Sequence, residues 1–134
     1  MSLEGQLVDK KSLRAVTGKT ADWQELAKDC IAFANAQGGR LLIGVEDDDE
    51  IPQPTQRIDP ALPDKIRRRI GELTVNVSVL PAICQAGNGG EFIELKVARS
   101  MSSVASTTDG RYFLRVSDES KPVVGDDIMR LAAE

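Results

Sequence analysis

Histidine is absent from the 134 residues of this chain. Its absence excludes Ser–His and Cys–His catalytic pairs, zinc sites with His ligands and the commonest general base. The two cysteines, Cys30 and Cys84, can neither complete a tetrahedral thiolate zinc site nor define a disulfide framework, so we expect reduced thiols. Any chemistry must therefore use carboxylates, lysines, arginines, hydroxyls or a hard metal ion.

Long apolar runs and a secretory signal are also missing. No apolar run approaches the roughly 20 residues of a membrane span. The opening Met-Ser-Leu-Glu has neither the basic nor the apolar region of a signal peptide. We therefore expect a cytoplasmic protein with no membrane partner. A chain of 134 residues, 41% of them apolar, is long enough to form a single domain over 1–134.

An excess of positive charge is missing too, because 17 basic residues stand against 21 acidic ones. Free-standing nucleic-acid-binding domains are usually basic. However, five of the acidic residues are consecutive, over Glu46–Glu50, and the rest of the chain is close to neutral and contains the run Arg67–Arg69. The local distribution of charge is therefore more informative than the total.

Apolar periodicity predicts two helices. The first covers Asp22–Gln37, with Thr20 or Asp22 as its N-cap and Gly38–Gly39 at its end. The second begins at Asp59–Pro60, with proline in its first turn. Its buried stripe consists of Leu62, Ile66, Ile70 and Leu73.

The remaining segments are mostly extended. We predict a short strand within 5–14, strands over 41–45, 75–86, 91–97 and 111–116, a turn at 87–90, a loop over 100–110 and a closing helix over 126–133. The order β-α-β-α-β-β-β-α is typical of an α+β domain in which a mixed sheet packs with three helices.

Two segments resemble ligand-binding motifs. Gly18-Lys19-Thr20 matches the tail of a phosphate-binding P-loop, but the glycine required five residues earlier is Leu13, so ATP binding is not expected. The run Glu46–Glu50 follows a predicted strand, and a bound Mg²⁺ or Mn²⁺ would relieve its internal repulsion. The alternative is a solvated acidic turn.

Basic residues form two candidate contacts for nucleic acid. Strand periodicity places Arg111, Phe113 and Arg115 on one face, where guanidinium groups around a ring suit phosphates and a stacked base. The alternative is a sheet face whose arginines pair with carboxylates. Arg67 and Arg68 lie off the buried stripe of the second helix and either meet phosphates or form a solvated face.

Three segments carry a resemblance to a known family. Cys30–Asp47 is similar to the signature AFAN-x-x-GG-x-(L/I)-x-(I/F)-G-V-x-D of the Schlafen AlbA-like domain. Glu4–Lys11 resembles the opening E-x-x-x-x-E-F-K of that family, and Gly110–Val116 resembles its late strand G-x-Y-Y-(I/L)-R-x-G. Together these segments extend over nearly the whole chain.

The resemblance implies a nucleic-acid-binding module, for DNA rather than RNA, of a bacterial transcriptional regulator, and one module of a longer protein. The nucleic-acid-binding residues that we expect are Lys11, Arg67, Arg68, Arg111, Phe113 and Arg115.

The resemblance also leaves two alternatives. In Schlafen proteins that cut RNA, three carboxylates form the site, and they correspond here to Glu4, Asp9 and Asp47. These residues would be both the catalytic groups and the ligands of Mg²⁺ or Mn²⁺ in a metal-dependent ribonuclease. Here Asp9 replaces the usual glutamate and Lys10 the usual phenylalanine. The other alternative is a non-catalytic protein-interaction or homodimerisation domain.

Overall fold

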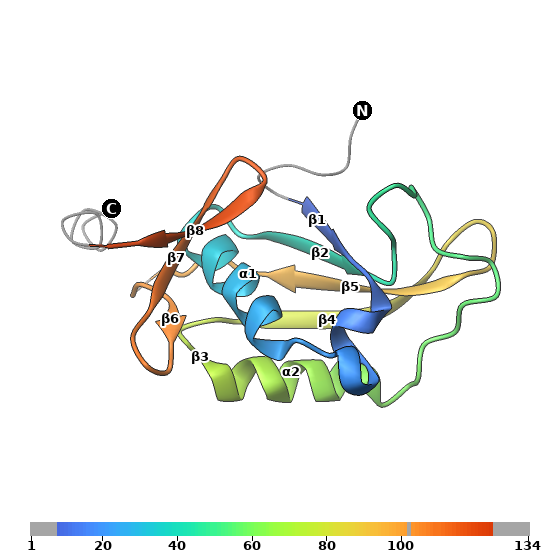
Figure 1. Ribbon diagram of the computed structural model, residues 1–134, viewed down its shortest axis with the longest axis horizontal. Helices are drawn as coiled ribbons and strands as arrows, with labels where there is room; N and C mark the ends of the chain where they lie inside the picture. The colour runs from blue at the N-terminus through green and yellow to red at the C-terminus, as the bar shows by residue number, and fades with distance from the viewer. Residues whose placement is uncertain (1–7, 102, 125–134) are drawn as a thin grey trace.

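The computed structural model describes residues 8–101 and 103–124 as an α+β fold (Figure 1). Its main sheet has the strand order β1 (Val8–Lys11), β2 (Gly39–Ile43), β5 (Glu91–Val97) and β4 (Val79–Gln85), in which β1 and β2 are parallel and the other pairs are antiparallel. The elements are β1 (Val8–Lys11), η1 (Leu13–Val16), η2 (Gly18–Thr20), α1 (Trp23–Asn35), β2 (Gly39–Ile43), α2 (Leu62–Leu73), β3 (Thr74–Val75), β4 (Val79–Gln85), β5 (Glu91–Val97), β6 (Ser106–Thr107), β7 (Tyr112–Val116) and β8 (Glu119–Val123). No helix in this described part is long and apolar enough to cross a membrane.

Helix α1 confirms the periodicity of its sequence. The carboxylate of Asp22 accepts a hydrogen bond from the Glu25 amide at 3.1 Å and so provides the N-cap. At the other end, the amide of Gly38 donates to the carbonyl of Phe33 at 2.8 Å. Gly38 has φ +79°, and a Cβ there would lie 2.8 Å from the carbonyl oxygen of Val97. The chain can therefore turn from α1 into β2 because residue 38 is glycine.

Gly38→Ala is expected to lower the free energy of unfolding by about 2 kcal/mol or more, because it adds left-handed strain to a backbone clash. Urea unfolding followed by circular dichroism would measure the loss. Gly71→Ala is the matched control, since Gly71 lies within α2 and a Cβ there meets nothing within 4 Å. The control should be neutral or up to about 1 kcal/mol stabilising. A Gly38 variant as stable as the wild type would contradict this account of the turn.

Helix α2 begins later than predicted, at Leu62 instead of Asp59–Pro60. Asp59 instead organises the turn before the helix, where its side chain accepts from the Ala61 amide at 2.9 Å. The proline in the first turn is Pro63. The predicted stripe is confirmed, because the helix buries Leu62, Ile66 and Ile70 and packs Leu73 against the core.

The sheet has one face in the core and a second face that is only partly exposed, since Lys10 and Leu42 on it are buried. In β2 and β5 the alternate residues Leu41, Ile43, Ile93 and Leu95 are fully buried in the same core as the stripes of α1 and α2. Figure 1 shows α1 in front of the sheet and α2 beside β4. The intervening residues of both strands point to the opposite face, where Arg40 pairs with Lys96 in the strand register.

The C-terminal hairpin β7–β8 forms a separate two-stranded sheet that crosses α1 (Figure 1). Asn35, the last residue of α1, connects the helix to β7 and to the chain before β6. Its side-chain amide donates to the carbonyls of Ala105 and Phe113 at 2.9 Å and accepts from the Ala105 amide at 2.7 Å. Strands β6 and β8 were not predicted. The predicted helix over 126–133 lies outside the described residues.

Candidate nucleic-acid interface

Strand β7 alternates as predicted, but its arginine–aromatic face points inward. Phe113 is 9% exposed and Arg115 is 3% exposed, and both face α1. The guanidinium of Arg115 lies over the ring of Phe33, 4.7 Å from its centroid. The expectation that Phe113 and Arg115 form an exposed phosphate-and-base surface is therefore wrong. The alternative, arginine paired with carboxylates, is the arrangement that the structure has at Arg115.

Arg115 belongs to a buried ionic cluster between β1, α1 and the hairpin, which consists of Asp9, Lys11, Asp29, Arg115 and Ser120. The Nη2 atom of Arg115 lies 3.5 Å from Asp9 Oδ2, and its Nη1 atom lies 3.8 Å from Asp29 Oδ1. The hydroxyl of Ser120 accepts from Arg115 at 3.1 Å and donates to Asp29 Oδ1 at 2.6 Å. Charged groups are tolerated in a protein interior only when they are paired in this way. The cluster therefore fastens the hairpin to α1 and β1.

Lys11 is the second cation of this cluster, and its amine, like the guanidinium of Arg115, is directed at carboxylates of the protein and not at the outer surface. Its Nζ lies 2.6 Å from Asp29 Oδ2 and 3.9 Å from Asp9 Oδ2. Burial by itself would lower the pKa of Lys11, but the combined attraction of Asp29, Asp9 and Glu25 and the hydrogen bond to Asp29 together outweigh it and raise that pKa. The amine is therefore a charged partner of Asp29, and the expected phosphate contact of Lys11 is not supported by its geometry.

Helix α2 presents the basic residues that remain available. Arg67 and Arg68 are exposed, and within the described residues neither makes an ion pair. On the flank of the same helix, Lys65 and Arg69 lie over the ring of Trp23, each 5.8 Å from its centroid. Arg69 is also 3.7 Å from Glu72. The outer surface of α2 is thus basic, with an aromatic side chain from α1 at its border.

The acidic run lies away from this surface. Lys10 Nζ donates to the carbonyl of Asp49 at 2.7 Å, and Arg14 pairs with Glu46 at 3.8 Å. The acidic run Glu46–Glu50 therefore lies beside β1 and η1. Helix α2 instead packs beside β4, at the opposite edge of the main sheet (Figure 1). An acidic total charge is therefore compatible with a basic surface on α2.

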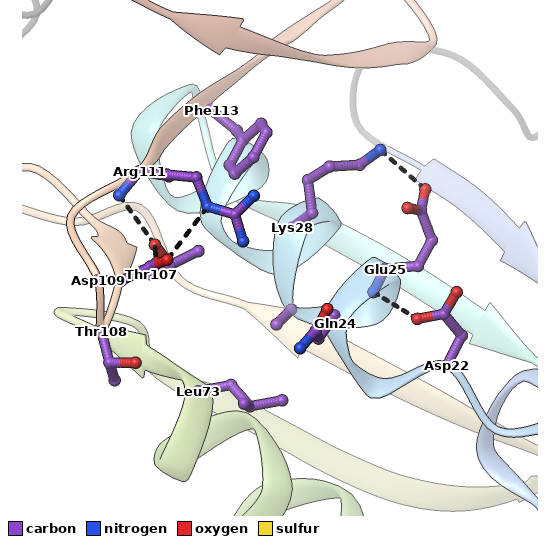
Figure 2. A pocket seen from close by; sticks show the side chains of 11 residues that line it. Asp22, Gln24, Glu25, Lys28, Leu73, Thr107, Thr108, Asp109, Arg111 and Phe113 are labelled. Atoms are coloured by element: carbon purple, nitrogen blue, oxygen red, sulfur yellow. Dashed lines mark hydrogen bonds and ion pairs between the residues drawn. The ribbon is translucent and has the colours of Figure 1, made fainter.

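Arg111 is exposed and lines a pocket of about 420 Å³ between α1, the end of α2 and the β6–β7 turn (Figure 2). Its Nε lies 3.5 Å from the carboxylate of Asp109. The wall formed by α1 carries Lys28, 3.0 Å from Glu25, and Phe113 lines the pocket from β7. Arg111 and Phe113 thus lie in one pocket, although Arg67, Arg68 and Arg115 lie elsewhere.

The sequence profile of the Schlafen, AlbA_2 family matches residues 4–124. The chain belongs to the Schlafen AlbA_2 family. This membership confirms the resemblance and connects the chain to a family associated with nucleic acids.

One solved structure similar to this Schlafen AlbA_2 domain is the crystal structure of the DIP2311 protein from Corynebacterium diphtheriae. The two share 25% sequence identity with a TM-score of 0.66, over 88% of this chain and 25% of that one. The domain therefore spans about a quarter of the length of that chain. A search of curated proteins finds no significant match.

Within residues 8–101 and 103–124 of this Schlafen AlbA_2 domain, no group of three or more carboxylates or thiols could hold a metal ion, so Asp9 and Asp47 belong to no such group there. Glu4 lies outside the described residues. Asp9 is paired with Lys11 and Arg115, and Asp47 is exposed. Burial raises the pKa of Asp9, and the two nearby cations oppose that rise. Because these cations would also repel a divalent ion, the surroundings of Asp9 do not suit a bound Mg²⁺ or Mn²⁺, and the three-carboxylate site stays a prediction.

Sequence reasoning missed the residues that hold the cluster together from the other elements, above all Asp29 and Ser120. A signal for Asp29 exists, because it lies three residues after Leu26 and four before Phe33, on the apolar side of the helix. A charged residue at such a position requires a buried partner. Ser120 has no comparable signal, since β8 reads as a polar segment.

Proposed function

We propose that this Schlafen AlbA_2 domain is the nucleic-acid-binding module of a bacterial transcriptional regulator, and that it binds DNA rather than RNA. The observation that carries the proposal is the exposed pair Arg67 and Arg68, two guanidinium groups without ion pairs in the described part of the chain. Such groups suit phosphate oxygens, which accept bidentate hydrogen bonds from arginine. Arg111 is a third exposed guanidinium near the far end of α2, but it is already paired with Asp109 at 3.5 Å, so Arg67 and Arg68 are the main phosphate contacts.

These contacts would position the domain on a nucleic acid instead of reading its sequence, because phosphates carry no base information. Lys65 and Arg69 extend the same surface along α2. Lys11 and Arg115 are not part of the proposed phosphate surface, because they are held in the ionic cluster with Asp9 and Asp29, and Phe113 is largely buried. The preference for DNA rests on the family resemblance.

Binding is expected to weaken steeply with salt, because each neutralised phosphate releases condensed counterions. Fluorescence anisotropy with labelled duplex DNA, single-stranded DNA and RNA of equal length would measure the affinity between about 50 and 200 mM salt. With three to five phosphate contacts, the affinity should fall by about 20- to 500-fold over this range. No binding at low salt, or binding that does not change with salt, would exclude the proposal.

Strand β4 argues against the alternative of a dimer that extends the main sheet. The Ser78 carbonyl and the Ala86 amide both bond toward β5 or its turn, so the intervening Pro81 faces the outer edge. A proline there removes a donor from the edge and hinders pairing with another strand. Although Leu80 and Ile83 on this strand are exposed, the Pro81 edge disfavours a dimer in which two β4 strands pair edge to edge.

A further inference from the structure

The pocket beside Arg111 combines an apolar interior with a polar rim (Figure 2). Phe113 and Ala27 are 9% and 2% exposed, and Leu73 closes the apolar side from the end of α2. The rim carries hydrogen-bonding groups from α1 and the β6–β7 turn. A volume of about 420 Å³ is within the size range of small-molecule sites.

The charges of the rim disfavour a phosphate inside the pocket. Three carboxylates line it, together with two cations, and each cation already has a carboxylate partner: Lys28 has Glu25 at 3.0 Å and Arg111 has Asp109 at 3.5 Å. A phosphate would therefore meet net negative charge. A flat, uncharged ring with N–H donors at its edge fits better, because carboxylates accept such donors and the apolar wall covers its faces.

The rim is preformed on the side of the β6–β7 turn. The Arg111 amide donates to Thr107 Oγ1 at 2.8 Å, the Thr107 amide donates to the Arg111 carbonyl at 2.8 Å, and the Gly110 amide donates to the Thr107 carbonyl at 3.0 Å. The hydroxyl of Thr107 also donates to Asp109, which is the main reason that the pKa of Asp109 lies below its usual value. Asp109 is thus held in place as an ionised acceptor, so little ordering is needed when a ligand enters.

The pocket also adjoins the basic surface of α2. Leu73, the last residue of α2, lines the pocket, and Gln24 of its α1 wall follows Trp23, whose ring lies under Lys65 and Arg69. A strand whose phosphates lie on α2 would therefore bring a base to this opening. We propose that the pocket takes an unpaired nucleobase of a single-stranded nucleic acid, an inference that rests on the proposed function.

The test uses three labelled probes with about the same number of phosphates: a single strand of about 20 nucleotides, its abasic analogue and a duplex of about 10 base pairs. Anisotropy should show the single strand binding about 5- to 100-fold more tightly than the abasic analogue, which is the range for stacking one base. The duplex should resemble the abasic analogue, because its bases are not free. If no probe binds, or if no binding depends on salt, the proposed function itself fails. Salt-dependent binding of equal strength to all three would overturn only the pocket.

Two variants locate the base preference. Ala27→Leu extends a side chain into the pocket and should remove the difference between the single strand and its abasic analogue. Ala27 is buried, so a larger side chain there can also disturb folding, and Asp109→Ala therefore provides a second test at an exposed turn. It should reduce the ratio of single-strand to abasic affinity by removing an acceptor.

Asp118→Ala is the charge-matched control for Asp109→Ala, in the exposed β7–β8 turn. Equal strengthening of all probes by Asp109→Ala and Asp118→Ala would overturn the pocket, since it would reflect net charge alone. A free nucleoside that competes as strongly as the oligonucleotide would also overturn it.

Discussion

Asp29→Asn is expected to lower the free energy of unfolding by about 3 to 5 kcal/mol, the range for removing one partner of a buried ion pair. Asp29 is 3% exposed and is the carboxylate that meets Lys11 at 2.6 Å, Arg115 at 3.8 Å and the Ser120 hydroxyl at 2.6 Å. Without its charge, the buried Arg115 and the half-buried Lys11 both lose a carboxylate partner, and Asp9 is the carboxylate that still meets both of them within the described residues. Chemical denaturation with a two-state fit would measure the difference.

Glu25→Gln is the matched control for this substitution. Glu25 also lies on α1 and pairs with a lysine at 3.0 Å, but its side chain is 47% exposed. Its loss should cost no more than about 1 kcal/mol, as for surface ion pairs near a helix N-terminus. Adding Lys11→Met to Asp29→Asn should recover part of the lost stability, because it removes the cation that Asp29 meets most closely, at 2.6 Å. An Asp29→Asn loss as small as that of Glu25→Gln would contradict a charged, paired interior.

The sequence predicted the elements whose signals are local. Helix α1 carries its apolar spacing, its Asp22 cap and its terminal Gly38 within one segment, and the structure has all three. Strand β5 has the predicted bounds, Glu91–Val97, because alternating apolar residues follow a glycine-rich turn. Strand β8 escaped prediction because Glu119–Val123 is polar and contains Pro122, and it is a strand only through its pairing with β7.

The orientation of β7 could not be predicted from its own residues. Period-two alternation places Phe113 and Arg115 together, but it does not say which face meets the core. The composition of the strand favours the wrong choice, because Leu114 and Val116 lie on the outer face and Val116 is 43% exposed. Arg115 is buried because Asp9 and Asp29, more than 80 residues earlier, meet it there. Tertiary pairing therefore decided the part of the candidate site that sequence reasoning missed.

Replacing Arg67 and Arg68 together by glutamine is expected to weaken binding of nucleic acid by about 10- to 100-fold at low salt, and to make the slope of log affinity against log salt shallower by about 2. The reason is that each arginine neutralises one phosphate and releases its counterions. Both side chains are exposed and without ion pairs in the described part of the chain, so their loss should leave the fold within about 0.5 kcal/mol of the wild type.

The charge-matched control is the pair Arg40→Gln and Lys96→Gln. These residues are register partners on the face of the main sheet opposite the core, and their side chains are 47% and 63% exposed. The control removes two positive charges, as the Arg67 and Arg68 variant does, but from a face that points away from the core against which α1 and α2 pack.

If the binding surface is α2, the control should keep most of the affinity and the wild-type salt slope. If both double variants lose affinity equally, the domain attracts the polyanion through its overall charge. If Arg67 and Arg68 can be removed without effect, α2 is not the surface that contacts phosphates.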